Sequence, residues 1–350
     1  MVKTLVIGDL HFDNKPYGLL DAQKNCVKDI IALNPKADHI IFLGDLMMHR
    51  KPYPSVLLAL KEVIEYASSR AMVTIIRGNH DSENKSDDGV TALSLFEKNP
   101  CQDLLPHPKN RHSSVRVVTQ TFYDHRTKMA FIPHYEDEER IKKDIANVPT
   151  GYTVFGHFGY CGSLNSAGDN DFSLALDDFR NPTILGHIHR HSRGEVVTLL
   201  GTPYTTNFSE HLKENFYATI NKKGELETHP ITFGPRHLVL DYDAVEENLD
   251  WINDENYTTQ LRINISTVDK DQDSIAELMD QLKVLSVEVK YTPLINEKYD
   301  TQEIQTINPV TEINDSLIED YINASNTTIG KDELLNGLNL IHENQQSRSK

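Results

Sequence analysis

The feature that most constrains this fold is a set of short apolar runs, each ending in a glycine and residues that can bind a metal ion. The five runs read KTLVIGDLH (3–11), HIIFLGD (39–45), VTIIRGNHD (73–81), YTVFGHF (152–158) and PTILGHIH (182–189). Consecutive Val, Ile, Leu and Phe residues are typical of a strand that is buried on both faces. Such strands require helices or a second sheet to cover them.

Two amphipathic segments separate the first three runs. Residues 21–34 and 55–70 carry apolar side chains at three- and four-residue steps, which indicates helices. Alternating strands and helices predict an α/β fold with parallel strands joined by right-handed crossovers. The carboxyl ends of such strands meet at one edge of the sheet, so the polar endings should gather there. The glycine before each ending allows the chain to turn sharply and the side chains to approach closely.

The polar endings offer oxygen and nitrogen donors without thiolates. The candidates are Asp9, His11, Asp45, Asn79, His80, His157, His187 and His189. This mixture of donors suits a divalent ion such as manganese, iron or zinc. So many donors exceed one tetrahedral site, whereas two ions that share a bridging carboxylate would use them.

The last run raises a separate question, because three histidines occupy alternate positions. Side chains two residues apart on an extended chain point the same way, so His187 and His189 can converge if the strand before them continues this far. We interpret this pair as a metal-binding edge. His191 is interpreted as a solvated loop residue, and His39 and His134 as loop histidines that are satisfied by hydrogen bonds.

The composition narrows the class of protein. The net charge of −17 argues against broad, nonspecific adhesion to nucleic acid, because neutralising phosphates requires an excess of Lys and Arg. A local site stays possible, since bound divalent cations add positive charge that a residue count omits. The three cysteines form no C-x-x-C pair, so neither a disulfide framework nor a zinc knuckle is expected. Without a long apolar run or a signal-peptide pattern, we expect a cytoplasmic protein with no membrane span.

The pattern changes near residue 235, and we assign residues 1–235 to a first domain. A smaller α/β unit follows at 236–295, with strands at 260–266 and 286–293 and a helix at 273–285. Residues 296–350 combine a polar linker with two short amphipathic helices, around 317–322 and 334–341. Their apolar stripes either bind a partner or pack back on the chain, and the sequence leaves both open.

The motifs GDLH, GDL, GNHD, GH and GHIH, in this order, resemble the five signatures of the calcineurin-like metallophosphoesterases. The resemblance implies a two-sheet αββα sandwich and two divalent ions. It implies that Asp9, His11 and His189 bind one ion and that Asn79, His157 and His187 bind the other. Asp45 would bridge the two ions. It also implies that His80 contacts phosphate and protonates the leaving oxygen, while Asp81 orients His80.

Within this superfamily the chain most resembles the SbcD-type nuclease subunits of double-strand break repair and their phage relatives. The resemblance rests on GHFGYCGS (156–163), LLGTPYTTNFSE (199–210) and NFYATI (215–220). It implies a manganese-dependent exonuclease and endonuclease acting on DNA ends, with residues 236–295 as a DNA-capping domain. It also implies a homodimer that works beside an SMC-like coiled-coil ATPase of the SbcC type, in the host cytoplasm if the chain is phage-encoded. The C-terminal helices would be the docking site for that ATPase.

One position departs from this family's pattern. Many members have a histidine three residues after the second-motif aspartate, where this chain has Met48, and His49 follows one step later. His49 is therefore a further catalytic candidate. Arg50, Lys51 and Arg190 are local cations that could contact DNA, although a solvated surface is the simpler interpretation. Two other functions stay open: a stand-alone phosphodiesterase or phosphatase on small substrates, and a non-catalytic scaffold for an ATPase.

Overall fold

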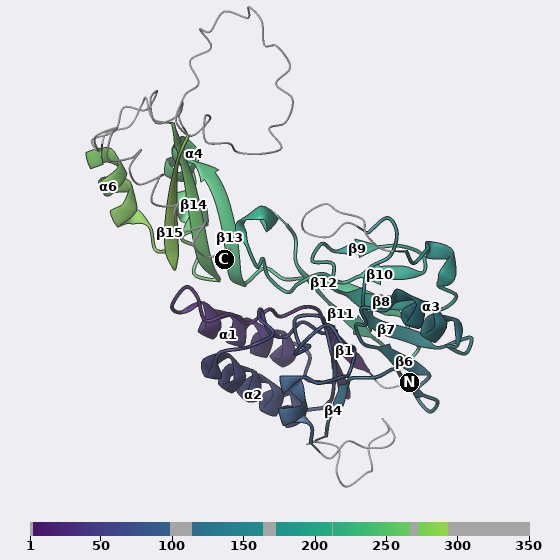
Figure 1. Ribbon diagram of the computed structural model, residues 1–350. Helices are drawn as coiled ribbons and strands as arrows, with labels where there is room; N and C mark the ends of the chain where they lie inside the picture. The colour runs from purple at the N-terminus through teal and green to yellow at the C-terminus, as the bar shows by residue number, and fades with distance from the viewer. Residues whose placement is uncertain (1–2, 99–113, 164–172, 212, 267–271, 293–350) are drawn as a thin grey trace, which may run out of the picture. The chain divides into compact units, whose positions relative to one another are not determined.

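The computed structural model describes residues 3–98, 114–163, 173–211, 213–266 and 272–292. Within these ranges the chain forms two mixed six-stranded sheets and a small three-stranded sheet (Figure 1). The predicted α/β class with two sheets is confirmed. The linker and helices predicted within residues 296–350 lie outside the described residues.

The first sheet has the strand order β12-β11-β1-β2-β3-β4. Its parallel part consists of β1 (Thr4–Ile7), β2 (His39–Phe42), β3 (Met72–Ile76) and β4 (Val115–Val118). Its antiparallel edge consists of β11 (Phe216–Ile220) and β12 (Leu226–Pro230). Every residue of β1, β2 and β3 is buried, in agreement with their continuous apolar sequences.

Two helices connect these parallel strands and cover one face of the first sheet. They are α1 (Leu19–Ala32) and α2 (Pro54–Ser68), close to the predicted ranges. Pro54 begins α2 at a position where the missing N–H removes no helical hydrogen bond. Val27 of α1 and Val63 of α2 pack into one core with Leu5 of β1. The helices therefore bury the outer face of the sheet.

The second sheet has the strand order β5-β6-β7-β8-β10-β9. Its strands are β5 (Phe122–Asp124), β6 (Met129–Ile132), β7 (Thr153–His157), β8 (Thr183–Gly186), β9 (Ser192–Arg193) and β10 (Val197–Leu199). β6, β7, β8 and β10 run parallel to one another. On its outer face α3 (Glu138–Ala146) buries Ile141 and Ile145. Short 3₁₀ turns lie at η1 (Ala92–Phe96), η2 (Leu176–Asp178) and η3 (Phe208–Glu210).

An apolar layer joins the inner faces of the two large sheets. Val6 and Ile41 from the first sheet pack in one cluster with Phe131, Phe155 and Ile184 from the second. The rings of Phe131 and Phe155 are stacked with centroids 5.4 Å apart. With helices on both outer faces, the layers follow the αββα order that the resemblance implies. This packing brings the strand ends of both sheets to a common edge.

The third sheet is wholly parallel, with the order β13-β14-β15. Its elements are β13 (Gly234–Asp241), α4 (Tyr242–Glu247), α5 (Leu249–Ile252), β14 (Tyr257–Ser266), α6 (Gln272–Gln281) and β15 (Ser286–Thr292). Its core contains Leu238, Leu261 and Ile263. The strands and the helix predicted for this unit are present, although α6 ends four residues before the predicted end at 285.

In the part of the chain that is described, no helix combines the length and the apolar character that crossing a membrane requires.

Candidate metal centre

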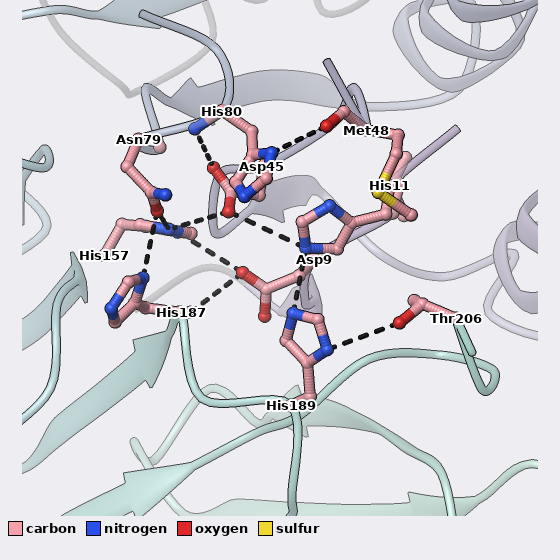
Figure 2. Close-up of polar contacts among 12 residues, drawn as sticks. Asp9, His11, Asp45, Met48, Asn79, His80, His157, His187, His189 and Thr206 are labelled. Atoms are coloured by element: carbon pink, nitrogen blue, oxygen red, sulfur yellow. Dashed lines mark hydrogen bonds and ion pairs between the residues drawn. The ribbon is translucent and has the colours of Figure 1, made fainter. Parts of the chain in front are cut away.

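The seven predicted ligands lie together at the carboxyl ends of strands from both large sheets. Figure 2 shows their side chains pointing toward one another. Asp9 and His11 follow β1, Asp45 follows β2 and Asn79 follows β3, whereas His157 ends β7 and His187 and His189 follow β8. Parallel strands place their polar endings at one edge, and the packing of the sheets joins the two edges.

His157 and Asp45 lie at the centre of this cluster. The Nε2 atom of His157 lies 3.3 Å from Asp45 Oδ2, and its Nδ1 atom lies 3.3 Å from Asp9 Oδ1. Asp45 Oδ2 is also 3.6 Å from His11 Nε2. All four side chains are buried.

The remaining ligands complete the cluster on opposite sides. The Oδ1 atom of Asn79 lies 3.1 Å from His157 Nε2 and 3.0 Å from His187 Nδ1. On the other side, the Nε2 atoms of His189 and His11 are 3.0 Å apart. The side chains thus separate into two halves that meet at Asp45.

Donor atoms in these halves form two groups compact enough to hold an ion each. One group contains His11, Asp45 and His80, and the other contains Asp45, His157 and His187; within each, the donor atoms lie within 4.8 Å of one another. Because both groups use Asp45, the arrangement is that of a binuclear site with a bridging carboxylate.

Buried donor atoms that need a partner indicate that cations fit here. Among the described residues, Asp9 Oδ2 and His11 Nδ1 are buried and accept or donate no hydrogen bond. His189 donates through Nδ1 to Glu210, so its Nε2 lone pair faces His11 Nε2 directly. These carboxylate, amide and imidazole donors suit manganese, iron or zinc. The residues present therefore fit two divalent ions.

The electrostatics of the ion-free site favour positive charge in a position that a cation would take. Burial alone lowers the pKa of His157, but the carboxylates of Asp45 and Asp9 raise the pKa to about 9. Burial raises the pKa of Asp9, whereas for Asp45 the imidazoles of His157 and His11 outweigh burial and hold the pKa well below its usual value. The carboxylates thus favour positive charge at His157, and a metal ion bound there would compete with a proton.

The backbone at the ligands is held in an uncommon conformation. His11, Asp45 and His187 have positive φ angles of 44°, 47° and 82°. Aspartate and histidine visit this left-handed region more readily than most residues, and the cost is roughly 1–3 kcal/mol each. A Cβ at Gly78 would overlap the Asp45 carboxylate, so only glycine fits before Asn79. The glycine positions singled out in the sequence therefore permit close approach as well as turning.

The turn at His187 corrects one sequence prediction. β8 ends at Gly186, so the strand does not continue through His187 and His189. His187 instead turns away with φ 82° and reaches Asn79, while His189 reaches His11. The backbone N–H of His187 donates to Asp9 Oδ1 at 2.8 Å and fixes this turn. Both histidines reach the site, but through a turn rather than through one face of a strand.

His80 lies beside the cluster with its ring oriented by the backbone. Its N–H donates to Asp45 Oδ1 at 2.8 Å, and its Nδ1 atom contacts the Met48 carbonyl oxygen at 2.6 Å. With Nδ1 directed at a carbonyl, Nε2 is the ring nitrogen left for other partners (Figure 2).

Asp81 differs from its expected role of orienting His80. Its carboxylate accepts backbone N–H bonds from Gly78 at 3.0 Å and from Leu46 at 2.9 Å, and it makes no contact with the His80 ring in the described structure. Burial, with the nearby Asp45 carboxylate, raises the pKa of Asp81 to about 7. Asp81 thus joins the loops after β2 and β3, and the Met48 carbonyl holds the His80 ring.

His49 is exposed, and none of the described residues forms a hydrogen bond or ring contact with it. The place three residues after Asp45 belongs to Met48, whose carbonyl contacts His80. The structure therefore does not bring His49 to the cluster.

The other histidines correct three interpretations. His39 is a buried strand residue rather than a loop residue, and its Nε2 atom contacts Thr74 Oγ1 at 2.8 Å. His191 is partly buried, with Nδ1 2.9 Å from the Leu199 carbonyl oxygen, rather than solvated. His134 follows β6 and lies with its ring centroid 5.9 Å from that of His187. Both ring nitrogens of His134 are buried and make no hydrogen bond of ordinary geometry in the described ranges, although the ring interacts with the backbone of His157.

Glu210 is a supporting residue that sequence reasoning missed. It is buried, and its Oε1 atom lies 2.5 Å from His189 Nδ1. The Thr206 N–H and the Lys213 ammonium group donate to its Oε2 atom at 2.8 and 3.1 Å. Burial alone raises the pKa of Glu210, but these partners hold it well below its usual value. The only signal in the sequence was the NFSE segment, which contributed to the family resemblance but assigned no role to Glu210.

Replacing Glu210 by glutamine should lower the affinity for one of the two ions and leave the affinity for the other unchanged. The glutamine keeps the shape but has one acceptor oxygen in place of two and no charge, so its N–H₂ group must face either His189 or the donors of Thr206 and Lys213, and the orientation of His189 is weakened. Loss of such a partner costs roughly 10–100-fold in metal affinity. Calorimetric manganese titration of Glu210→Gln should show one site weakened and one retained, whereas Glu227→Gln on exposed β12 should match the parent. Equal weakening of both sites would contradict the assignment of Glu210 to His189.

Comparisons with known proteins agree with this geometry. The calcineurin-like phosphoesterase family matches residues 2–222, which contain all the residues of the cluster. No curated protein matches the chain at a significant level. Since the family match covers more than half of the sequence and the buried cluster supplies its chemistry, the chain belongs to the calcineurin-like phosphoesterase family.

Proposed function

We propose that this phosphoesterase is a two-metal DNA nuclease that processes DNA ends in recombination and repair. Its membership of the family and the buried His/Asp cluster imply metal-dependent hydrolysis of phosphoesters. The observation that carries the proposal is the pair of donor groups that share Asp45, one of which includes His80. The step from phosphoesterase to nuclease is supported by the SbcD-like segments, which include Glu210, the hydrogen-bond partner of His189.

The residues of the site have distinct roles in this proposal. One ion would be held by Asp9, His11, Asp45 and His189, and the other by Asp45, Asn79, His157 and His187. Two divalent ions, with manganese as the first choice, supply positive charge to the phosphoryl oxygens and activate water for in-line attack. Asp45 holds the two halves together, and Glu210 keeps His189 in one tautomer.

His80 would act as the proton donor to the leaving oxygen. The Met48 carbonyl directs its Nδ1 atom, so the proton for the leaving group comes from Nε2. Asp81 supports this step indirectly, because it joins the loops that carry Asp45 and His80.

DNA contact has to be local, because the chain carries a net charge of −17. We propose that the third sheet unit serves as a DNA-capping domain, and that an SMC-like coiled-coil ATPase supplies further DNA contact. Lys51 and Arg190 are exposed and remain candidates for phosphate contact.

A second copy of the chain is the other proposed partner. An apolar groove of ≈ 550 Å³ is lined by residues of α2, η1 and β4. Leu58 and Leu95 in this groove are 62% and 75% exposed, which is costly for large apolar side chains in a monomer. A homodimer that covers this groove would bury them, and light scattering of the full chain would give the mass of two copies.

The nuclease proposal is tested by incubating pure protein and manganese with end-labelled linear duplex DNA and with bis-p-nitrophenyl phosphate. Shortened or nicked DNA supports a nuclease. Cleavage of the small ester alone would favour the stand-alone phosphodiesterase, and cleavage of neither would favour the non-catalytic scaffold. Adding a chelator should stop every reaction, because the ions are required for both substrates.

A further inference from the structure

A second cluster of charged side chains lies beside the metal-binding residues, on loops from both large sheets. Arg50 follows β2, Lys85 follows β3, and His134 and Glu136 follow β6. Glu136 is at the centre: its carboxylate oxygens lie 3.5 Å from Arg50 Nη2, 3.8 Å from Lys85 Nζ and 3.9 Å from His134 Nε2. The family signatures include none of these four residues.

These contacts leave hydrogen-bonding groups unused. All three distances exceed the 2.7–3.2 Å range of N–H···O hydrogen bonds, so Glu136 attracts the donors without bonding to them. Among the described residues, Arg50 Nη1 is buried with no hydrogen-bond partner, and the buried ring nitrogens of His134 make no hydrogen bond of ordinary geometry, although the ring interacts with the backbone of His157. Each unsatisfied buried polar atom costs roughly 1–3 kcal/mol, and several around one carboxylate require an explanation.

The backbone holds His134 firmly in this position. Its N–H donates to the Arg77 carbonyl oxygen at 2.9 Å, and the buried Arg77 guanidinium donates to the His134 carbonyl oxygen. These two bonds fix the backbone at His134 against the residue that follows β3 and so place its side chain beside Glu136.

The chemistry of these groups specifies an anion with several acceptor oxygens. A guanidinium group is always charged and offers only donors, so the partner of Arg50 Nη1 must be an acceptor. Arg50 and Lys85 surround the Glu136 carboxylate, and the Asp87 carboxylate accepts the Glu136 backbone N–H nearby, so attraction for an anion comes from the directed donors and not from an excess of positive charge. Phosphate oxygens match a guanidinium group in charge and geometry.

The short distance between His134 and the predicted metal ligands further restricts which anion could bind here. The His134 ring centroid is 5.9 Å from that of His187 and 6.2 Å from that of His157. An anion held here would be adjacent to a phosphoryl group at the ions. A neighbouring phosphate in the same nucleic-acid strand meets both requirements, whereas a single small phosphodiester has no second phosphate to offer.

We propose that Arg50 and His134, with Lys85 at the rim, bind the phosphate next to the scissile one and so favour a polynucleotide strand over a single phosphodiester. This inference rests on the proposed phosphodiesterase function. Glu136 keeps Arg50 and Lys85 in place before the strand binds, and its charge weakens the hold on the phosphate. Arg50 and His134 are thus binding residues for the strand, and Glu136 sets the affinity.

Binding of labelled hexathymidylate, measured by fluorescence anisotropy with a chelator present, tests the subsite without turnover. Arg50→Gln should weaken binding about tenfold, as expected for loss of a charge-assisted phosphate contact, and should reduce the salt dependence by about one phosphate. His134→Gln should also weaken binding, and Glu136→Gln should tighten it. The matched control is Arg180→Gln, since Arg180 is exposed and precedes the amino end of β8, at the opposite edge of the sheet.

Turnover with manganese separates this inference from the proposed function. Arg50→Gln should lower kcat/KM for hexathymidylate several-fold more than for bis-p-nitrophenyl phosphate. If Arg50→Gln and Arg180→Gln bind the oligonucleotide equally, the subsite is wrong, whatever the enzyme hydrolyses. If the parent protein hydrolyses neither substrate but binding falls in Arg50→Gln as stated, the proposed function fails and the phosphate subsite stands.

Discussion

Replacing Asp45 by asparagine is expected to give a folded protein that holds fewer than two manganese ions per chain and hydrolyses no phosphodiester above background. Asp45 belongs to both donor groups, so its Oδ2 atom serves both halves of the site. An asparagine N–H₂ group there would face His11 and His157 as a donor and would repel a cation. We expect affinity at least about 100-fold below that of the parent, the upper end of the cost of losing a supporting partner.

The asparagine variant is chosen because it preserves what the fold requires of this position. Asn tolerates the left-handed backbone, in which Asp45 has φ 47°. Its Oδ1 atom can still accept the His80 N–H bond. Thermal unfolding of the chelated protein should therefore remain cooperative, and the loss of ions can be attributed to the carboxylate.

Elemental analysis after manganese loading and gel filtration measures this effect. The matched control is Asp38→Asn, because Asp38 precedes the amino end of β2, at the opposite edge of the sheet from Asp45. Asp38→Asn should retain two ions. Two ions in Asp45→Asn would show that Asp45 does not bridge them, and the binuclear assignment would have to be abandoned.

The sequence predicted the first sheet and its helices well because their patterns are strong and local. β1, β2 and β3 are buried on both faces, so their apolar runs are continuous. α1 and α2 pack against the sheet with only one side of each helix, so their apolar positions repeat with the helical period. β5 has only three residues, and β6, although apolar and as long as β1 and β2, is followed by no glycine and ligand motif that would have singled it out, so both went unpredicted.

The candidate site could be predicted only for residues next to a strand end. Asp9 and Asp45 follow apolar runs directly, and parallel pairing brings them together. Glu210 carries no such signal, and His134 lies near a strand end but fits no signature; their contacts with His189 and His187 depend on how distant loops pack. The Met48 carbonyl is a further example: any residue at this position offers the same oxygen to His80, so side-chain chemistry says nothing about it.

Replacing His80 by alanine is expected to lower kcat by roughly 10²–10⁴-fold on an ester with a poor leaving group, the usual size of general acid catalysis. The effect should shrink as the leaving group improves, because an acidic phenol departs without a proton from the enzyme. Thymidine 5′-phenyl phosphate and thymidine 5′-p-nitrophenyl phosphate form a suitable pair, since they differ only in the acidity of the leaving phenol. This comparison does not depend on DNA being the substrate.

Ion content must be measured beside turnover, because His80 also belongs to one of the donor groups, with His11 and Asp45. A proton donor can be removed while both ions stay bound, whereas removing a ligand releases one. We expect His80→Ala to retain two ions, and His49→Ala to lose far less activity, since His49 is exposed. An equal loss on both esters together with loss of an ion would identify His80 as a ligand. The proton would then have to come from another group, and the Met48 carbonyl would serve to aim a ligand instead of an acid.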